Sequence, residues 1–402
     1  MNNEQEVIET GTFFCVVDKN LSVRDYPPHN HCMRLLGIKE NVFIDEVLLN
    51  EGGCEVFLVD INIDILFILM KSNMSKCEIS FFSHKRLWIK IDYMLSQMSD
   101  DSYFYEIFSG DDPTFINVNN IDFVEGPTLR NNPKVQVDTI EDDDDQSSQW
   151  ILDSFHVGQG MCSVFHNDDT GFIIDCGAGT PIFKNNYKNK KTPMVNDLLN
   201  VLAKITKNDR KIPLIVSHSD SDHWRLIDWD PGILKKIEKI YVPDKVTSLA
   251  TKSKHIIGIV YPISDTTFMR TKSGSTYISV YRSEPKHRDN NGECLVCLVE
   301  INGKKALLAG DYVYSRMLTD KNVNIANIGT YKYQAVVVPH HGDEASSRDI
   351  VEPFSDEAVA FFSAGGRYGH PTWASIGNHM HKGYTEISDP TCGYIKIISL
   401  LS

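Results

Sequence analysis

The sequence lacks any apolar run long enough to cross a membrane. Its most apolar segment, residues 56–70, is interrupted by Asp60, Asn62 and Asp64, whereas a membrane-spanning helix needs roughly 20 apolar residues. The first residues, MNNEQEVIETG, contain neither a basic start nor an apolar stretch, so we expect no secretory signal peptide. These absences predict a cytoplasmic protein without a membrane partner.

Positive charge and paired cysteines are also scarce. With 40 Lys and Arg against 54 Asp and Glu, the formal net charge is −14, so any contact with nucleic acid would need a local basic patch. The nine cysteines are scattered and odd in number, which indicates no small disulfide framework. Cys294 and Cys297 form a lone CxxC inside an alternating apolar segment, and we predict that they are buried strand thiols.

One acidic stretch divides the chain. Residues 138–148 include four consecutive aspartates, which repel one another and cannot pack together. We therefore predict a solvated linker at 138–149, between an N-terminal domain at 1–137 and a second domain at 150–402. Two domains also fit a length of 402 residues, since a domain usually has about 100–200. An acidic metal-binding cluster is the alternative explanation of the stretch.

The N-terminal region is predicted to be a small α+β domain. Residues 13–17, 87–93 and 103–108 have the pattern of strands, and residues 32–37 are typical of a short helix that stops at glycine. The opening FFCVVDKNLSVRDY, followed by HCMRLLGI, resembles the start of a PAS sensory domain. This resemblance implies a sensory or interaction role, in which the domain regulates the second domain or recruits a protein partner.

The region after the linker has a different pattern. Helix-like segments lie at residues 194–205 and 233–240. Apolar strand-like runs that end in polar or glycine-containing turns lie at residues 151–155, 171–174, 213–216, 239–242, 306–308, 335–339 and 358–363. This alternation predicts an α/β domain with sheets in the middle and helices outside.

Histidines and aspartates follow four of these runs. In chain order the motifs are HSDSDH at 218–223, GD at 310–311, HHG at 340–342 and GRYGHP at 366–371. Strand ends along one edge of a sheet can converge on one site. Nitrogen and carboxylate ligands without thiolate suit zinc, manganese or iron. A surface loop explains each motif taken alone, whereas the four together predict a metal site.

Seven short segments carry a resemblance to a known family. In chain order they are HVGQG at 156–160, FIIDCG at 172–177, HSDSDH, NGECLV at 291–296, LLAGD at 307–311, PHHGD and GRYGHP. In this order they resemble the metallo-β-lactamase superfamily, and within it the hydrolase domain of ComEC-type DNA-uptake competence proteins. The resemblance implies an αββα sandwich and a metal-dependent hydrolase with one or two zinc or manganese ions per chain. It also implies a nucleic acid as substrate.

The resemblance assigns the central residues to two metal positions. It implies that His218 and Asp220 hold a first metal, that Asp222 and His223 hold a second, and that Asp311 bridges the two.

The remaining matches lie around these ligands. Either His340 or His341 supplies a late histidine ligand, and we prefer His340 because it is nearer the strand. His370 is implied to be a ligand or a transition-state stabiliser. Asp175 is implied to orient the HSDSDH segment at 218–223, called the metal loop below, from outside the ligand set. Arg367 could neutralise charge on a phosphate, although a loop arginine is more often only solvated.

Three departures from the family pattern affect the predicted metal content. Asp220 stands where a histidine is usual, and Asn291 where many members have another histidine, although the competence-type branch shares this asparagine. His156 and Met161 replace two acids around VGQG. One metal ion, or manganese in place of zinc, is therefore a reasonable alternative to two zinc ions.

The predicted ligands indicate hydrolysis by activated water. A divalent cation lowers the pKa of bound water to ~7, and two cations can clamp the attacking and leaving oxygens of a phosphodiester. With a single metal, Asp222 could accept the proton instead. We therefore predict a phosphodiesterase, most simply a nuclease.

Two other functions stay open. The same chemistry could cleave an ester, lactone or amide of a small molecule, because the fold alone does not choose. A catalytically idle sensor or binding protein is the third possibility. Basic runs at 184–191 and 204–211 could guide a phosphate backbone, with a solvated surface as the alternative.

Overall fold

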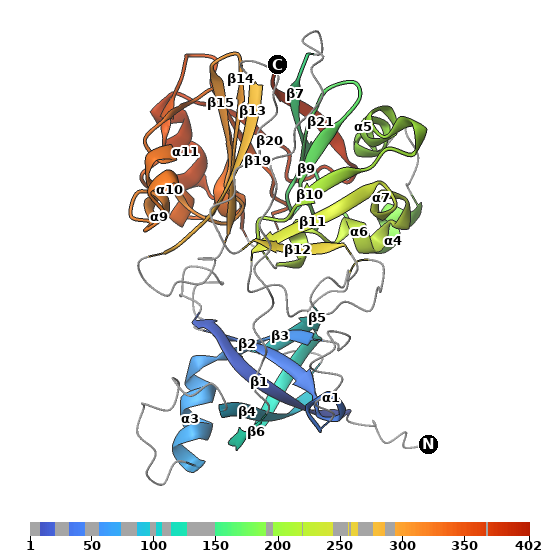
Figure 1. The fold of residues 1–402 in the computed structure, drawn as a ribbon. Helices are drawn as coiled ribbons and strands as arrows, with labels where there is room; N and C mark the ends of the chain where they lie inside the picture. Colours follow the sequence, from blue (N-terminus) through green and yellow to red (C-terminus); the bar gives the residue numbers. More distant parts are fainter. Residues whose placement is uncertain are drawn as a thin grey trace, which may run out of the picture. The chain divides into compact units, whose positions relative to one another are not determined.

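The computed structural model describes residues 9–20, 32–44, 56–73, 87–96, 102–106, 114–126, 149–189, 196–218, 220–243, 256, 259–263, 276–285, 294–366 and 369–402. These residues form two compact units, which are treated one at a time below (Figure 1). Apart from Gln149, the predicted linker at 138–149 lies outside the described residues, so its boundaries stay a prediction.

The N-terminal unit is a closed barrel of antiparallel strands. The strands follow one another around the barrel in the order β1-β2-β3-β5-β6-β4, and β4 pairs with β1 to close it. Helices α1 (Glu40–Ile44) and α3 (Ile63–Asn73) follow β2 and β3. The strands are β1 (Thr10–Asn20), β2 (Cys32–Lys39), β3 (Val56–Asn62), β4 (Leu87–Leu95), β5 (Tyr103–Glu106) and β6 (Thr114–Glu125).

The predicted short helix at residues 32–37 is wrong, because this segment belongs to strand β2. Leu35 faces the barrel core, whereas Arg34 pairs with Asp60 of β3 through two side-chain contacts of 2.9 Å. Both charged residues are buried, and a buried charge is tolerated only when it is paired. This pairing between neighbouring strands explains why CMRLLG forms a strand. The PAS resemblance stays a prediction that rests on the first strands.

The second unit contains two large sheets. The first sheet has the order β12-β11-β10-β9-β8-β7-β21 and the second has the order β13-β14-β15-β17-β19-β20. The strands of the first are β7 (Ile151–His156), β8 (Cys162–His166), β9 (Gly171–Cys176), β10 (Ile212–Ile215), β11 (Ile237–Pro243), β12 (Val260–Ile263) and β21 (Lys396–Leu401). The strands of the second are β13 (Thr276–Arg282), β14 (Leu295–Ile301), β15 (Lys304–Leu308), β17 (Ala335–Val337), β19 (Val359–Phe362) and β20 (Thr385–Ser388).

Helices cover the outer face of each sheet (Figure 1). Beside the first sheet lie α4 (Lys184–Asn189), α5 (Asp197–Ile205), α6 (Leu226–Trp229) and α7 (Pro231–Leu234). Beside the second lie α9 (Tyr314–Met317), α10 (Val323–Ile328) and α11 (Trp373–Lys382), with the short pair β16 (Lys332–Tyr333) and β18 (Glu352–Pro353). No helix in the described part of the chain has both the length and the apolar character to span a membrane.

The two sheets pack face to face over one core. Phe165 and Ile174 of the first sheet share this core with Val337 of the second. Along β15, Leu308 faces this core while Leu307 faces a second core beneath the helices. Strands buried on both sides need continuous apolar runs, which is why the sequence has few alternating strands here. The predicted α/β class is confirmed, and the four layers form the αββα sandwich that the family resemblance implies.

Two details of the second unit refine the sequence predictions. The predicted helix at 233–240 is wrong after Leu234, where α7 ends and β11 begins at Ile237. Ile240 of β11 pairs with Leu214 of β10, and burial of these β-type residues between neighbouring strands outweighs the helix-like spacing. The CxxC thiols, Cys294 and Cys297, are both buried, as predicted.

His379 of α11 is a buried titratable group that should make stability depend on pH. Its Nδ1 donates to the Ser375 carbonyl oxygen at 2.7 Å, and its Nε2 accepts from the Tyr314 hydroxyl at 3.1 Å. Burial lowers the pKa of His379 to about 4, against ~6.5 for an exposed histidine. Between these two pH values the unfolded chain binds more protons than the folded chain, so stability rises with pH.

We therefore expect the His379 contribution to be complete above pH ~6.5 and to be lost as the pH falls toward ~4. Between pH ~7.5 and ~5 it amounts to about 2 kcal/mol of unfolding free energy. Urea unfolding at both pH values measures it, and His379→Gln should lose about 2 kcal/mol less than the wild type on acidification. Equal losses in the two proteins would contradict this origin of the pH dependence.

Candidate metal centre

The ends of strands from both sheets meet at one place in the second unit. Strand β10 leads to His218, β15 leads to Asp311, and β17 leads to His340 and His341. Backbone hydrogen bonds join these ends: Leu295 N donates to the Ser217 carbonyl, and His340 N donates to the Gly310 carbonyl. The convergence predicted from the four motifs is therefore present for GD, for HHG and for the described residues of HSDSDH.

Two groups of side chains at this place could each hold a metal ion. In the first, ligand atoms of His218, His223 and Asp311 lie within 4.8 Å of one another. In the second, those of Asp222, His223 and His341 lie within the same distance. The groups share His223, so the five side chains form one continuous cluster.

Asp311 lies at the centre of this cluster. Its carboxylate oxygens are 3.4 Å from His218 Nε2, 3.2 Å from His223 Nε2 and 3.8 Å from His341 Nε2. His341 Nε2 also lies 3.1 Å from Asp222 Oδ2. The sequence-based assignment of Asp311 as the carboxylate between two metal positions agrees with this central place.

Each of three histidines has its Nδ1 held by a neighbour, while its Nε2 faces the cluster. His223 Nδ1 lies 2.9 Å from the Asp175 carboxylate, His341 Nδ1 lies 2.8 Å from the Ser363 carbonyl, and His218 Nδ1 lies 3.1 Å from Ser217 Oγ. A carboxylate or carbonyl can only accept, so Nδ1 of His223 and of His341 carries the proton. Nε2 is then left with a lone pair, as in a metal-ligating histidine.

The atoms that face one another are buried and lack hydrogen bonds. Among the described residues, Nε2 of His218, His223 and His341 and Oδ1 of Asp311 are buried without a hydrogen-bond partner. Buried polar atoms without partners are rare and costly, and four of them around one point fit the ligand set of a divalent cation. The donor set of imidazole nitrogen and carboxylate oxygen suits zinc or manganese.

The charges of the cluster balance one another. Burial alone would lower the pKa of His223, but the carboxylates of Asp311 and Asp175 raise that pKa well above its ordinary value. Burial would raise the pKa of Asp311, yet the nearby histidines, His340 first, hold it well below the usual range. The Asp311 carboxylate therefore stays ionised at neutral pH and favours a positive charge among the rings, which a bound cation would supply.

The structure favours His341 over His340 as the late histidine of the cluster. The chain takes a left-handed turn in η7 (Pro339–Gly342), with φ of 48° at His340 and 55° at His341. This turn brings His341 beside Asp222, whereas His340 Nε2 lies 3.6 Å from Asp311 and His340 Nδ1 lies 3.0 Å from Asp343. Nearness to the strand, on which the preference for His340 was based, does not decide which ring turns inward.

The other predicted residues lie at the margin or outside the described residues. Asp220 Oδ2 is 3.5 Å from His218 Nε2 and its side chain is 22% exposed. The His370 ring is 5.9 Å from that of His340 and 6.5 Å from that of His341, and burial lowers the pKa of His370 to about 4. Arg367 and Asn291 are not among the described residues.

Asp175 holds the start of the HSDSDH segment through hydrogen bonds. Its carboxylate accepts from Ser217 N at 2.6 Å, from Ser217 Oγ at 2.9 Å and from His223 Nδ1 at 2.9 Å. Asp175 itself has a φ of 55°, a left-handed conformation that is uncommon for a residue with a side chain. The strand end of β9 therefore fixes both the backbone and one ring of the HSDSDH segment.

Sequence reasoning missed two residues that support the cluster. Ser217 contacts Asp175, His218 and His223 together, and its place directly before HSDSDH was the available signal. Asp343 accepts from His340 Nδ1 and from both the backbone and hydroxyl of Ser346, and it is the last letter of PHHGD.

Comparison with known proteins gives limited similarity. No family model matches the chain, and no curated protein sequence matches it. A CmlA beta-hydroxylase mutant has a similar structure at 15% sequence identity and a TM-score of 0.36, covering 63% of this chain and 54% of that one. The metallo-beta-lactamase fold protein YhfI from Bacillus subtilis is similar at 12% identity and a TM-score of 0.36, covering 62% and 100%. The chain thus spans about half the length of the beta-hydroxylase.

Gly177, directly after strand β9, allows a test of whether the metal loop must pack closely against the end of this strand. A Cβ at Gly177 would lie 1.5 Å from the carbonyl oxygen of Asp222, so Gly177→Ala must displace the segment that carries Asp222 and His223. We expect metal affinity to fall by roughly 10–100-fold, as for loss of other supporting contacts. Titration of the metal-free protein with zinc or manganese measures the affinity.

Gly377→Ala is the matched control for this substitution. Gly377 lies in α11 and a Cβ there would meet nothing within 4 Å, so metal affinity should stay at the wild-type value. Equal affinities of wild type and Gly177→Ala would show that the close contact between β9 and the metal loop does not position the ligands.

Proposed function

We propose that the chain is a metal-dependent hydrolase that cleaves phosphodiester bonds, most simply those of a nucleic acid. The observation that carries the proposal is the set of three histidines whose Nε2 atoms surround Asp311 while their Nδ1 atoms are held from behind. This orientation is the one that metal ligation requires. In a surface loop these atoms would be solvated, and they would not be buried without hydrogen-bond partners.

The proposed ligands divide between two adjoining positions. His218 and Asp311 would hold one ion, with Asp220 at its margin, and Asp222 and His341 would hold the other. His223 lies in both groups, and Asp311 is near both. Bound zinc or manganese would supply an activated water at neutral pH and, with two ions, a clamp on both oxygens of a displacement.

The residues at the open side of the cluster have separate tasks in this proposal. Asp222 is 23% exposed at its side chain, and with a single metal bound it can accept a proton from a water on that side. Although burial would raise the pKa of Asp222, the close approach of the His341 ring and the charges of His223 and His341 lower it to about 2. His370 lies beside His340 and His341 and can donate a hydrogen bond to a phosphoryl oxygen.

The basic runs near the site give this assignment little support. Lys184 lies 3.3 Å from Asp228, Lys204 lies 2.5 Å from Asp168, and Arg210 lies 3.5 Å from Asp169. Cations that are paired with neighbouring acids attract a phosphate backbone weakly. This pairing and the net charge of −14 favour hydrolysis of an ester, lactone or amide of a small molecule as the second candidate.

The ligand set argues against the third candidate, an idle sensor or binding protein, because such a protein needs no buried ring nitrogens without partners. The N-terminal barrel is proposed to regulate the hydrolase or to bind a protein partner. Its sensory role rests on the resemblance of its first strands.

The test combines metal content with cleavage of labelled single-stranded DNA, RNA and a bis-aryl phosphodiester. We expect one or two ions of zinc or manganese per wild-type chain and metal-dependent cleavage. Asp222→Ala with His223→Ala removes ligands from both groups, so metal and activity should both be lost. Asp175→Asn removes no ligand but weakens the support of the His223 ring and of Ser217, and it should cost roughly 10–100-fold in activity.

His381→Ala serves as the control, since His381 is exposed on α11 and should keep full metal content and activity. Circular dichroism shows whether each variant is folded. Bound metal without cleavage of any of the three substrates would favour the small-molecule hydrolase. A folded wild-type protein that binds neither metal would refute the proposed centre.

A further inference from the structure

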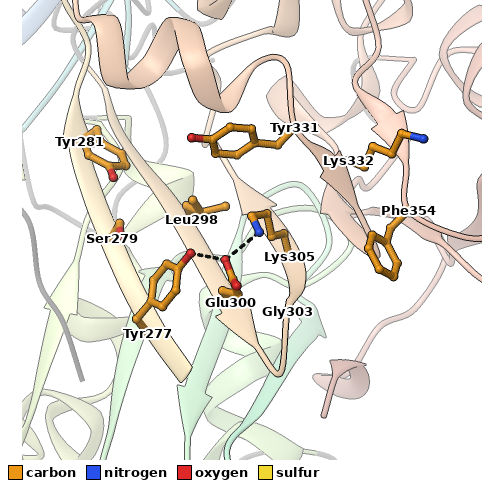
Figure 2. A pocket seen from close by; sticks show the side chains of 10 residues that line it. All are labelled: Tyr277, Ser279, Tyr281, Leu298, Glu300, Gly303, Lys305, Tyr331, Lys332 and Phe354. Atoms are coloured by element: carbon orange, nitrogen blue, oxygen red, sulfur yellow. Dashed lines mark hydrogen bonds and ion pairs between the residues drawn. The ribbon is translucent and has the colours of Figure 1, made fainter. Parts of the chain in front are cut away.

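A pocket of about 610 Å³ lies on the second sheet, away from the metal cluster. Figure 2 shows its lining residues, which come from β13, from the β14–β15 hairpin and from the segments around β16 and β18. Four of them are aromatic: Tyr277, Tyr281, Tyr331 and Phe354. Tyr331 is 37% exposed and Phe354 is 50% exposed, so ring surface is available to a ligand.

Strand register explains why these side chains face the same side. Tyr277, Ser279 and Tyr281 are two residues apart along β13, so they point to one face of the sheet. Tyr277 lies opposite Glu300 of β14, and Glu300 lies opposite Lys305 of β15. A row of aromatic, acidic and basic side chains therefore crosses three neighbouring strands.

The charged pair in this row is fixed by its neighbours. The Tyr277 hydroxyl donates to Glu300, and Lys305 Nζ lies 2.7 Å from the same carboxylate (Figure 2). Lys305 Nζ is also 5.8 Å from the centre of the Tyr331 ring, within the range of a cation–π contact. The carboxylate and the ring thus contact the same cation, which orders the pocket before a ligand enters.

Ser279 gives an independent sign that a ligand belongs here. The residue is 1% exposed, and its hydroxyl has no hydrogen-bond partner among the described residues. Ser279 lines the pocket between the two tyrosines of β13. Because buried hydroxyls normally have a partner, this one points to a polar group that is supplied by a bound molecule.

We propose that this pocket binds the base of a nucleotide. A flat heteroaromatic ring can stack on the exposed rings, and such stacking is sequence-tolerant. The Ser279 hydroxyl and the Glu300 carboxylate can bond to polar atoms at the edge of the base, as carboxylates do to exocyclic amines. Lys332, exposed at the rim, can contact the phosphate.

The base can come from a free nucleotide or from a strand of nucleic acid. The strand version deepens the proposed nuclease function and rests on it. Lys305 in the pocket and Asp311 in the metal cluster are separated by six positions of one strand and its following turn, so by at most roughly 20 Å at about 3.3 Å per residue. A strand that follows this path falls within the site sizes of roughly 4–16 nucleotides that are usual for such binding.

The test measures binding in the presence of a chelator, so that cleavage plays no part. Fluorescence anisotropy with a labelled single-stranded oligonucleotide and competition by adenosine and cytidine monophosphates are measured for the full chain. Tyr331→Ala removes the stacking ring and should weaken binding by about 10-fold or more. Ser279→Ala removes one hydrogen bond and should weaken binding by roughly 2–10-fold.

Tyr394→Ala is the matched control, because Tyr394 is 46% exposed and lies outside the pocket. It should bind as the wild type does. Competition by monophosphates that is sensitive to Tyr331→Ala identifies a free nucleotide as a ligand, whereas binding of the oligonucleotide alone identifies a strand.

No binding of either ligand, or binding that Tyr331→Ala and Ser279→Ala leave unchanged, would overturn the proposal. Binding of a neutral oligosaccharide that depends on Tyr331, with no nucleotide binding, would overturn it in favour of a carbohydrate. Nucleotide binding without any metal-dependent cleavage would leave the pocket in place and count against the nuclease. Cleavage of the bis-aryl phosphodiester without nucleotide binding would count against the pocket alone.

Discussion

The metal cluster depends on the carboxylate of Asp175. This single side chain accepts hydrogen bonds from the backbone and hydroxyl of Ser217 and from the ring of His223, so it joins the end of β9 to the start of the metal loop. Because one of its oxygens accepts the hydrogen bond from Nδ1–H of His223, this carboxylate also decides that Nε2 of the ring faces Asp311. The same side chain therefore fixes the backbone of the metal loop and the orientation of the His223 ring, and displacement of Asp175 would disturb both.

Burial makes this contact strong and also leaves ring and carboxylate atoms of the cluster without hydrogen-bond partners. Asp311 and the histidine rings around it lie at the ends of strands whose side chains are buried on both faces. Electrostatic interactions are larger in such surroundings than in water, and an unpartnered polar atom is correspondingly unfavourable. The sheets position the ligands rigidly, and a divalent ion would satisfy the atoms that the protein alone leaves without partners.

The sequence indicated that these segments converge, because each follows an apolar run and strand ends in a layered fold are near one another. It could not decide between His340 and His341, since that choice depends on two left-handed backbone conformations in η7. It also misread residues 32–37 as a helix, because the contact that makes them a strand is with Asp60, which is distant in sequence. Local pattern is informative about which residues approach a site, but less so about which way each side chain turns.

The lining of the pocket could not be predicted from local sequence pattern either. No motif marks Tyr277, Glu300 and Lys305, and these residues lie side by side only through the registers of β13, β14 and β15. The same registers continue toward Leu295, whose backbone bonds to Ser217 at the start of the metal loop. A shift of one residue in the β13–β14 or the β14–β15 pairing would turn the side chains of the shifted strand to the other face. The row of aromatic, acidic and basic side chains in the pocket would then be lost, and the backbone contact between Leu295 and Ser217 would be displaced. The register of these three strands is therefore a constraint that the pocket and the metal centre share.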